Sequence, residues 1–128
     1  MKPIDEISSD VIGTAMAIHR EIGPGLLESV YEAILARKLA RLGYEAEQQK
    51  PLGFAFEDME FPAAFKVDLL INRRLIVELK SVERLQPVHS KQLLTYLRLM
   101  KLPVGLLINF GCDTLKEGIK RVVNNYED

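Results

Sequence analysis

Asp68, Glu78 and Lys80 are the residues of this chain whose types and spacing could do chemistry. The two carboxylates interrupt two short apolar runs, residues 67–71 and 75–79, which a polar turn separates. This pattern predicts a β-hairpin. Burying ionised groups in such a hairpin costs several kcal/mol unless each group finds a partner or a metal ion. That cost is the first indication that the carboxylates have a function.

The register of this hairpin decides whether the two carboxylates meet. Side chains alternate across a strand, so Glu78 and Lys80 lie on one face together with Ile76. Residues directly opposite each other share a face, so Asp68 joins Glu78 only if paired residue numbers sum to an even total. That register requires the three-residue loop Asn72-Arg73-Arg74 or an equivalent bulge. A two-residue loop would put the carboxylates on opposite faces.

Two carboxylates on one face would lie roughly 5 Å apart, and their repulsion would have to be relieved by a cation or by protonation. Hard oxygen ligands of this kind suit Mg²⁺ or Mn²⁺. A neighbouring lysine is what a site that activates water or binds phosphate needs. The hairpin is therefore a candidate metal site.

The sequence also resembles a known family. An Asp followed about ten residues later by Glu-x-Lys on a buried strand is similar to the core motif of the PD-(D/E)XK nuclease superfamily. Residues 25–31 (GLLESVY) match the GxxExxY signature of one of its small bacterial and archaeal branches, and residues 89–96 (HSKQLLTY) resemble the helix that follows in that branch. The resemblance covers about residues 12–123. Val67 stands where the superfamily's name has Pro, a position that varies.

This resemblance implies a fold, an activity and a set of site residues. The implied fold is α/β, a restriction-endonuclease-like core with a mixed central β-sheet flanked by helices. The implied activity is metal-dependent hydrolysis of phosphodiester bonds in DNA or RNA. Asp68, Glu78 and the main-chain carbonyl of Leu79 would bind Mg²⁺ or Mn²⁺, with Glu28 completing or extending the shell. Lys80 would orient the attacking water, whose pKa the metal lowers, and stabilise charge on the phosphate.

Two helices are expected to border the site. Position alone makes Glu28 an acid that complements the dipole of a helix over about residues 27–42, whereas the resemblance makes it part of the metal site. Tyr31 is expected to support the site as a core aromatic with its hydroxyl hydrogen-bonded at the edge.

A helix over residues 87–101 places His89, Gln92 and Tyr96 along one edge of its apolar stripe. In the functional interpretation, Gln92 positions water or phosphate near Lys80, and His89 contacts phosphate. In the alternative interpretation, the same residues are a polar flank with one capped histidine.

The other elements follow from capping and turn signals. A first helix is expected from the N-cap candidates Ser8-Ser9-Asp10 to Gly23. Residues 44–65 are expected to be β, with turns at Lys50-Pro51 and Glu57-Asp58. The remaining elements are a buried strand over residues 104–110, parallel to that of Glu78, and a strand or short helix over residues 116–124, with strand favoured.

Composition bounds the class of protein. A chain of 128 residues, 48% hydrophobic and 27% charged, predicts a single domain over residues 1–128 that folds without metal or disulfide support. Its one cysteine, Cys112, is expected to be a small buried or half-buried residue. The first ten residues do not resemble a signal peptide, and no run approaches the roughly 18 apolar residues of a membrane span. We therefore expect a cytoplasmic protein with no membrane contact.

The charge is unevenly distributed. The net charge of −1 argues against strong nonspecific affinity of the whole molecule for nucleic acid. Residues 66–101, however, carry eight Lys or Arg against three Asp or Glu. A basic region around a carboxylate cluster suits a polyanion cut by metal ions, although a solvated basic face gives the same pattern. The expected phosphate contacts are Arg73, Arg74, Arg84, Lys91 and Arg98.

Three functions are compatible with these patterns. The intact Asp68, Glu78 and Lys80 favour a magnesium-dependent nuclease that binds nucleic acid. The same fold can serve as a noncatalytic nucleic-acid- or protein-binding module, and the small size and near-neutral charge favour dependence on a second copy or a partner protein. A phosphoester hydrolase acting on a small nucleotide is the third function. Dependence of cleavage on substrate length separates it from a nuclease.

Overall fold

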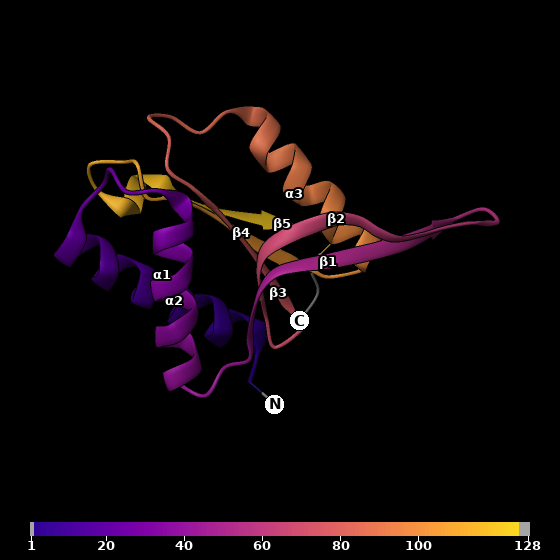
Figure 1. Cartoon of the computed structure of the whole chain (residues 1–128), viewed down its shortest axis with the longest axis horizontal. Coiled ribbons are helices and arrows are strands. Elements are labelled where there is room, and N and C mark those ends of the chain that lie inside the picture. The colour runs from indigo at the N-terminus through magenta and orange to yellow at the C-terminus, as the bar shows by residue number, and fades with distance from the viewer. Residues whose placement is uncertain (1, 126–128) are drawn as a thin grey trace.

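The computed structural model describes residues 2–125 and contains one five-stranded mixed sheet with helices on both faces (Figure 1). The elements are α1 (Ile4–Ile22), α2 (Glu28–Arg41), β1 (Ala46–Phe56), β2 (Met59–Ile71), β3 (Leu75–Lys80), α3 (Pro87–Met100), β4 (Val104–Asn109), the 3₁₀ helix η1 (Leu115–Gly118) and β5 (Ile119–Val123). The strands lie in the order β1-β2-β3-β4-β5, with β3 and β4 parallel and the other neighbours antiparallel. The expected α/β class, with helices flanking a mixed sheet, is confirmed.

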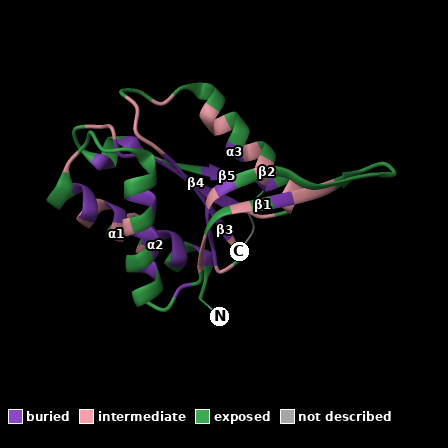
Figure 2. Ribbon diagram, viewed as in Figure 1, coloured by how far each residue is buried: buried purple, intermediate pink, exposed green. Residues whose placement is uncertain are grey.

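The central strands are covered on both faces, which explains their almost continuously apolar sequences. Every residue of β4 is buried, as are the first five of the six residues of β3 (Figure 2). Val77 belongs to the core under α1 and α2, and Ile76 belongs to the core under α3. Alternation along β3 therefore puts Glu78 and Lys80 on the α3 face of the sheet.

The turn between β2 and β3 has the predicted three residues, Asn72-Arg73-Arg74. Ile71 pairs with Leu75, so the paired residue numbers sum to an even total. Asn72 adopts φ 52°, in the left-handed region that asparagine tolerates better than most residues. The predicted register is correct, and it puts Asp68 opposite Glu78 on one face.

The first helix begins earlier than predicted. Ser8, Ser9 and Asp10 have the side chains of N-cap residues, but they lie inside α1, which starts at Ile4. Ile4 and Ile7 are both buried and extend the apolar stripe of the helix by two turns toward the N-terminus. Burial of this stripe outweighs the capping preference, so the predicted helix start is wrong.

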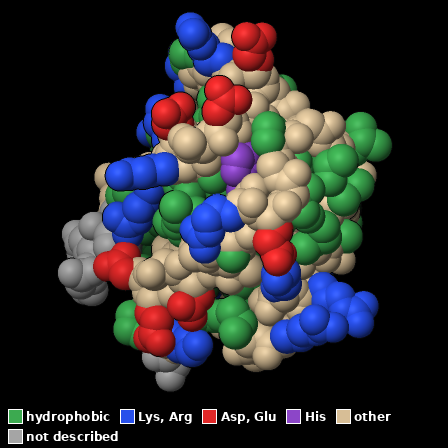
Figure 3. All heavy atoms as spheres, turned by 90° about the vertical axis from the view of Figure 1, so that its left-hand side faces the viewer, with side chains coloured by type: hydrophobic (Ala, Val, Ile, Leu, Met, Phe, Trp, Pro, Cys, Tyr) green, Lys and Arg blue, Asp and Glu red, His purple; other side chains and the backbone are tan. Residues whose placement is uncertain are grey.

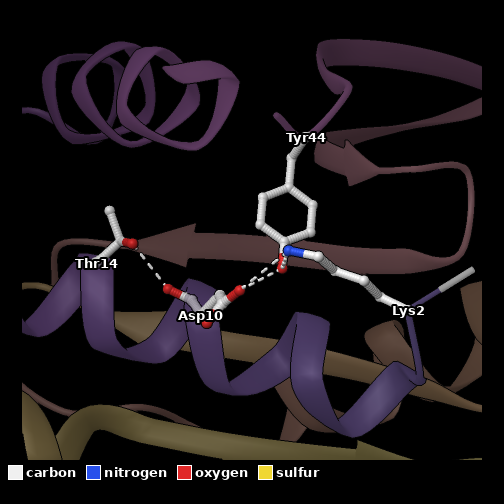
Figure 4. Close-up of polar contacts among 4 residues, drawn as sticks. All are labelled: Lys2, Asp10, Thr14 and Tyr44. Carbon is white, nitrogen blue, oxygen red and sulfur yellow. Dashed lines mark hydrogen bonds and ion pairs between the residues drawn. The ribbon is translucent and has the colours of Figure 1, made fainter. Parts of the chain in front are cut away.

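Asp10 instead fixes α1 to the segment that leads into β1 (Figure 4). Its carboxylate accepts a hydrogen bond from the Tyr44 hydroxyl and lies 3.7 Å from the Lys2 ammonium. The hydroxyl of Thr14, one turn on, donates to the backbone carbonyl of Asp10 over 2.7 Å. Burial and the hydrogen bond to Asp10 raise the pKa of Tyr44, so its hydroxyl stays a donor near neutral pH.

The turn predicted at Lys50-Pro51 is also wrong, because β1 runs through both residues. Pairs on either side keep one register, so Gln49 lies opposite Asp68 with a left-handed backbone, φ 47°. The strand therefore kinks at Gln49 and continues. Pro51 is tolerated because β1 is an edge strand and its outer side needs no ladder donor.

The remaining elements lie close to their predicted positions. Both α2 and α3 begin and end within one residue of expectation. The final segment is a strand, β5, preceded by η1. Cys112 is half-buried, as expected. Among the described residues, no helix combines the length and the apolar character needed to cross a membrane.

Candidate functional site

Asp68 and Glu78 meet where β2 and β3 separate. The backbone ladder ends at the pair Leu69–Val77, one residue before the two carboxylates. Beyond that pair, backbone N–H groups donate to carboxylate side chains instead of to backbone carbonyls. The Asp68 N–H donates to Glu78 Oε2 over 2.7 Å, and the Leu79 N–H donates to Asp68 Oδ2 over 2.8 Å. Each carboxylate thus binds the backbone beside the other, and the two converge as the register predicted.

One carboxylate of this pair, Glu78, has a raised pKa. Glu78 is only 7% exposed. Burial first, and the charge of Asp68 second, raise the pKa of Glu78 from its usual 4.5 to about 8. The Asp68 N–H and the charge of Lys80 oppose this rise without cancelling it. In the absence of a cation, Glu78 is therefore protonated at neutral pH.

The carboxylates of Asp68 and Glu78 are suitable ligands for a hard divalent cation. Such a cation would relieve their repulsion in place of the proton on Glu78. Within residues 2–125, however, no three His, Cys, Asp or Glu side chains are grouped so as to hold a metal ion. An ion bound by Asp68 and Glu78 would need further oxygen ligands. The carbonyl of Leu79, water and Glu28 are the candidates.

Glu28, the first residue of α2, reaches the chain just beyond β3. Its Oε2 accepts the Ser81 N–H over 3.0 Å, and the Ser81 hydroxyl donates to the Leu26 carbonyl over 2.8 Å. These contacts fasten the start of α2 next to Lys80. The described residues do not group Glu28 with Asp68 and Glu78, so its role as a metal ligand stays a prediction.

Tyr31 holds the loop that leads to Glu28. Its ring is fully buried and stacks on Phe110 with 4.2 Å between ring centroids. Its hydroxyl donates to the Gly23 carbonyl over 2.6 Å and accepts the Leu26 N–H over 3.2 Å. Tyr31 is thus a core aromatic with its hydroxyl bonded at the edge, as expected.

Of the three α3 residues expected at the site, His89, Gln92 and Tyr96, it is Tyr96 whose pKa the carboxylates influence. Its ring stacks on Phe65 of β2 at 4.3 Å between centroids. Burial first, and then the charges of Glu78 and Asp68, raise the pKa of Tyr96. The Tyr96 hydroxyl is therefore a neutral group near the carboxylate pair.

The other two α3 residues differ from each other. His89 Nδ1 accepts the Gln86 N–H over 3.1 Å, which closes a capping box at the start of the helix. This contact matches the alternative interpretation of a capped histidine. Gln92 is exposed and lies one turn before Tyr96 on the same side of α3. Its role in positioning water or phosphate stays a prediction.

Gln49, which the sequence did not single out, contacts Asp68 directly and connects it to Glu32. Gln49 Nε2 donates to Asp68 Oδ1 over 3.1 Å and to Glu32 Oε1 over 2.6 Å. Gln48 donates to the other oxygen of Glu32 over 3.1 Å. Glu32 lies on α2 and is only 7% exposed. The Gln49 amide therefore donates to two carboxylates, and it links α2 to the strand that carries Asp68.

Gln49→Ala should weaken Mn²⁺ binding by roughly tenfold or more, because Asp68 loses the donor that orients its Oδ1. Gln48→Ala is the matched control, since Gln48 contacts Glu32 and its loss leaves the bond between Gln49 and Asp68 in place. Isothermal titration calorimetry of both variants and the wild type measures the difference. Equal Mn²⁺ affinity in all three proteins would exclude a positioning role for Gln49.

Comparison with known proteins gives a match to one protein family. A family model described as the PD-(D/E)XK nuclease superfamily matches residues 5–122, which include every residue of the site described above. No curated protein and no solved structure matches the chain.

Proposed function

This chain belongs to the PD-(D/E)XK nuclease superfamily, and we propose that it is a divalent-metal-dependent nuclease with Asp68, Glu78 and Lys80 at its active site. The observation that carries the proposal is the pair of carboxylates formed by buried Glu78 and half-buried Asp68, which a cation would stabilise. Membership of the GxxExxY branch is part of the proposal and is supported by residues 25–31.

In this proposal the protein's own groups prepare the reaction. Asp68 and Glu78 would hold Mg²⁺ or Mn²⁺, and Glu78 would have to be ionised to do so. A bound divalent ion would neutralise phosphate charge and make a neighbouring water more acidic. Lys80, on the same face of β3 as Glu78, orients the attacking water and stabilises the negative charge that develops on the phosphate. Gln49 keeps the Asp68 carboxylate in its orientation.

The basic residues expected to contact phosphate fall into two groups. Arg73 and Arg74 at the β2–β3 turn contact other groups of the protein. Arg73 Nε lies 3.5 Å from the carboxylates of Glu45 and Glu47, and Arg74 donates to the carbonyl of Lys2. We therefore assign phosphate binding to the basic residues at the start of α3.

Arg84 and Lys91 are exposed before and within the first turns of α3, on the face of the sheet that carries Glu78 and Lys80. Arg98 is exposed near the far end of the same helix. The end of the molecule opposite the β1–β2 hairpin has basic and acidic side chains interspersed (Figure 3). Charge thus favours the α3 side as the nucleic-acid surface.

Incubation of the pure protein with single-stranded, double-stranded and branched DNA and RNA tests the proposed activity. We expect the wild type to cut at least one of these in Mg²⁺ or Mn²⁺ and none in EDTA. Longer substrates should be cut faster than dinucleotides, because they offer more phosphates for Arg84 and Lys91. Cleavage independent of length would favour a small-nucleotide hydrolase. Binding without cleavage of any substrate would favour a noncatalytic module.

A further inference from the structure

The hairpin of β1 and β2 continues past the body of the protein as an arm, residues 53–64 (Figure 1). β2 pairs with β3 only over residues 69–71, so the arm is a two-stranded ribbon. A ribbon of two strands is marginally stable in water unless it packs on something. Most of the arm is nevertheless exposed (Figure 2).

One face of this arm is apolar. Phe54 pairs with Phe61 and Phe56 pairs with Met59, and cross-strand partners share a face. Alternation along β1 puts both pairs on the same face. Phe56 is 57% exposed, Met59 48% and Phe61 40%. A clustered apolar surface of this kind marks an interaction site.

The edges of the arm oppose pairing by strand addition. Pro51 lies in β1 at the base of the arm and Pro62 lies in β2 within it. A proline cannot donate a ladder hydrogen bond, and prolines on edges prevent pairing with another chain. A partner would therefore pack against the apolar face.

Charge identifies the partner. The charged residues between positions 51 and 65 are Glu57, Asp58 and Glu60, all acidic and all at the tip of the arm. A cavity of about 350 Å³ lies at the end of α3, lined by Arg98, Lys101, Leu102, Pro103, Asn124 and Asn125. Its two basic residues are exposed. Leu102 of the cavity and Leu52 at the base of the arm belong to the same apolar cluster.

We propose that two copies of this chain form a two-fold dimer in which the arms pack face to face and antiparallel. A two-fold axis brings the tip of each arm to the base of the other, so the acidic tip meets Arg98 and Lys101 of the second copy. One chain thus supplies both the apolar surface and the opposite charge that the arm requires.

The size of this interface predicts its strength. A whole aromatic side chain offers roughly 200 Å², and three of the four apolar side chains are only 40–57% exposed, so the four would bury at most about 400 Å² per copy. Stable interfaces bury about 800 Å² per partner, so the contact of the tip with the cavity must supply the rest. We therefore expect a dimer that dissociates on dilution.

Sedimentation velocity of the 128-residue chain over a wide concentration range tests the proposal. The wild type should be dimeric at high concentration, and the exposed double variant Phe56→Ser, Met59→Ser should be monomeric. Circular dichroism and thermal unfolding should show the same fold in both proteins, since these side chains lie outside the core.

Charge exchange tests the antiparallel geometry. Asp58→Lys and Lys101→Glu should each weaken dimerisation by about tenfold, and the variant that carries both changes should regain it. A wild type that stays monomeric at the highest concentration would overturn the proposal, even if its arm captured another protein. The proposal would also be overturned if the variant Phe56→Ser, Met59→Ser remained a dimer. The same holds if the variant with both charge changes did not regain dimerisation.

Discussion

Lys80→Ala should reduce divalent-dependent cleavage by at least about a hundredfold while nucleic-acid binding stays within a few-fold of the wild type. Removing one group that stabilises developing charge typically costs that much in rate. Binding should persist, because Arg84 and Lys91 remain to contact phosphates. Single-turnover cleavage and equilibrium binding of the same labelled substrate, identified from the wild type, measure the two effects separately.

Lys91→Ala is the matched control, because it also removes one lysine from the α3 side of the protein. It should do the reverse, weakening binding and lowering the slope of log affinity against log salt by roughly one unit, with a smaller effect on the rate of bound substrate. If Lys80→Ala lost binding and cleavage in parallel, Lys80 would be a phosphate contact. If it cut at the wild-type rate, the proposed active site would be wrong.

The stability of the metal-free protein should fall as the pH rises toward 8. Glu78 has a pKa of about 8 in the folded protein against about 4.5 when unfolded, so the folded state holds the proton more tightly. Its contribution to stability is complete below about pH 4.5 and is lost as the pH rises through 8. The full difference is at most roughly 5 kcal/mol, since each pKa unit corresponds to about 1.4 kcal/mol.

Glu78→Gln should remove this pH dependence and raise the free energy of unfolding most at about pH 9. Urea unfolding in EDTA at about pH 6 and pH 9 measures it for both proteins. Asp68→Asn is the companion variant, because it removes the charge that is the second cause of the raised pKa. A large loss of stability from Glu78→Gln at both pH values would instead indicate that Glu78 forms a structural ion pair with Lys80.

The hairpin could be predicted because its constraints are local. Parity along one strand puts Glu78 and Lys80 on one face, and a three-residue turn brings Asp68 to the same face. The prediction of a turn at Lys50-Pro51 failed because the conformation there depends on contacts that are distant in sequence. Lys50-Pro51 has turn chemistry, but an edge strand accepts a proline, and the kink at Gln49 is set by contacts with Asp68 and Glu32.

The parts of the site that escaped prediction depend on contacts across the fold. Glu32 looks like a surface acid on an amphipathic helix, and only the packing of α2 over the sheet buries it beside Gln48 and Gln49. The spacing of Glu28 and Glu32, one helical turn apart, was the one available signal. Ser8 shows the opposite case, where a capping residue lies inside a helix because buried Ile4 extends it.

A calorimetric titration with Mn²⁺ at pH 7, in two buffers of different ionisation enthalpy, decides whether Asp68 and Glu78 form a metal site. We expect the wild type to bind at one saturable site and to release about one proton per ion, because Glu78 must ionise to bind it. The double variant Asp68→Asn, Glu78→Gln should show neither binding nor proton release. Equal binding by both proteins, or none by the wild type, would contradict the proposed site.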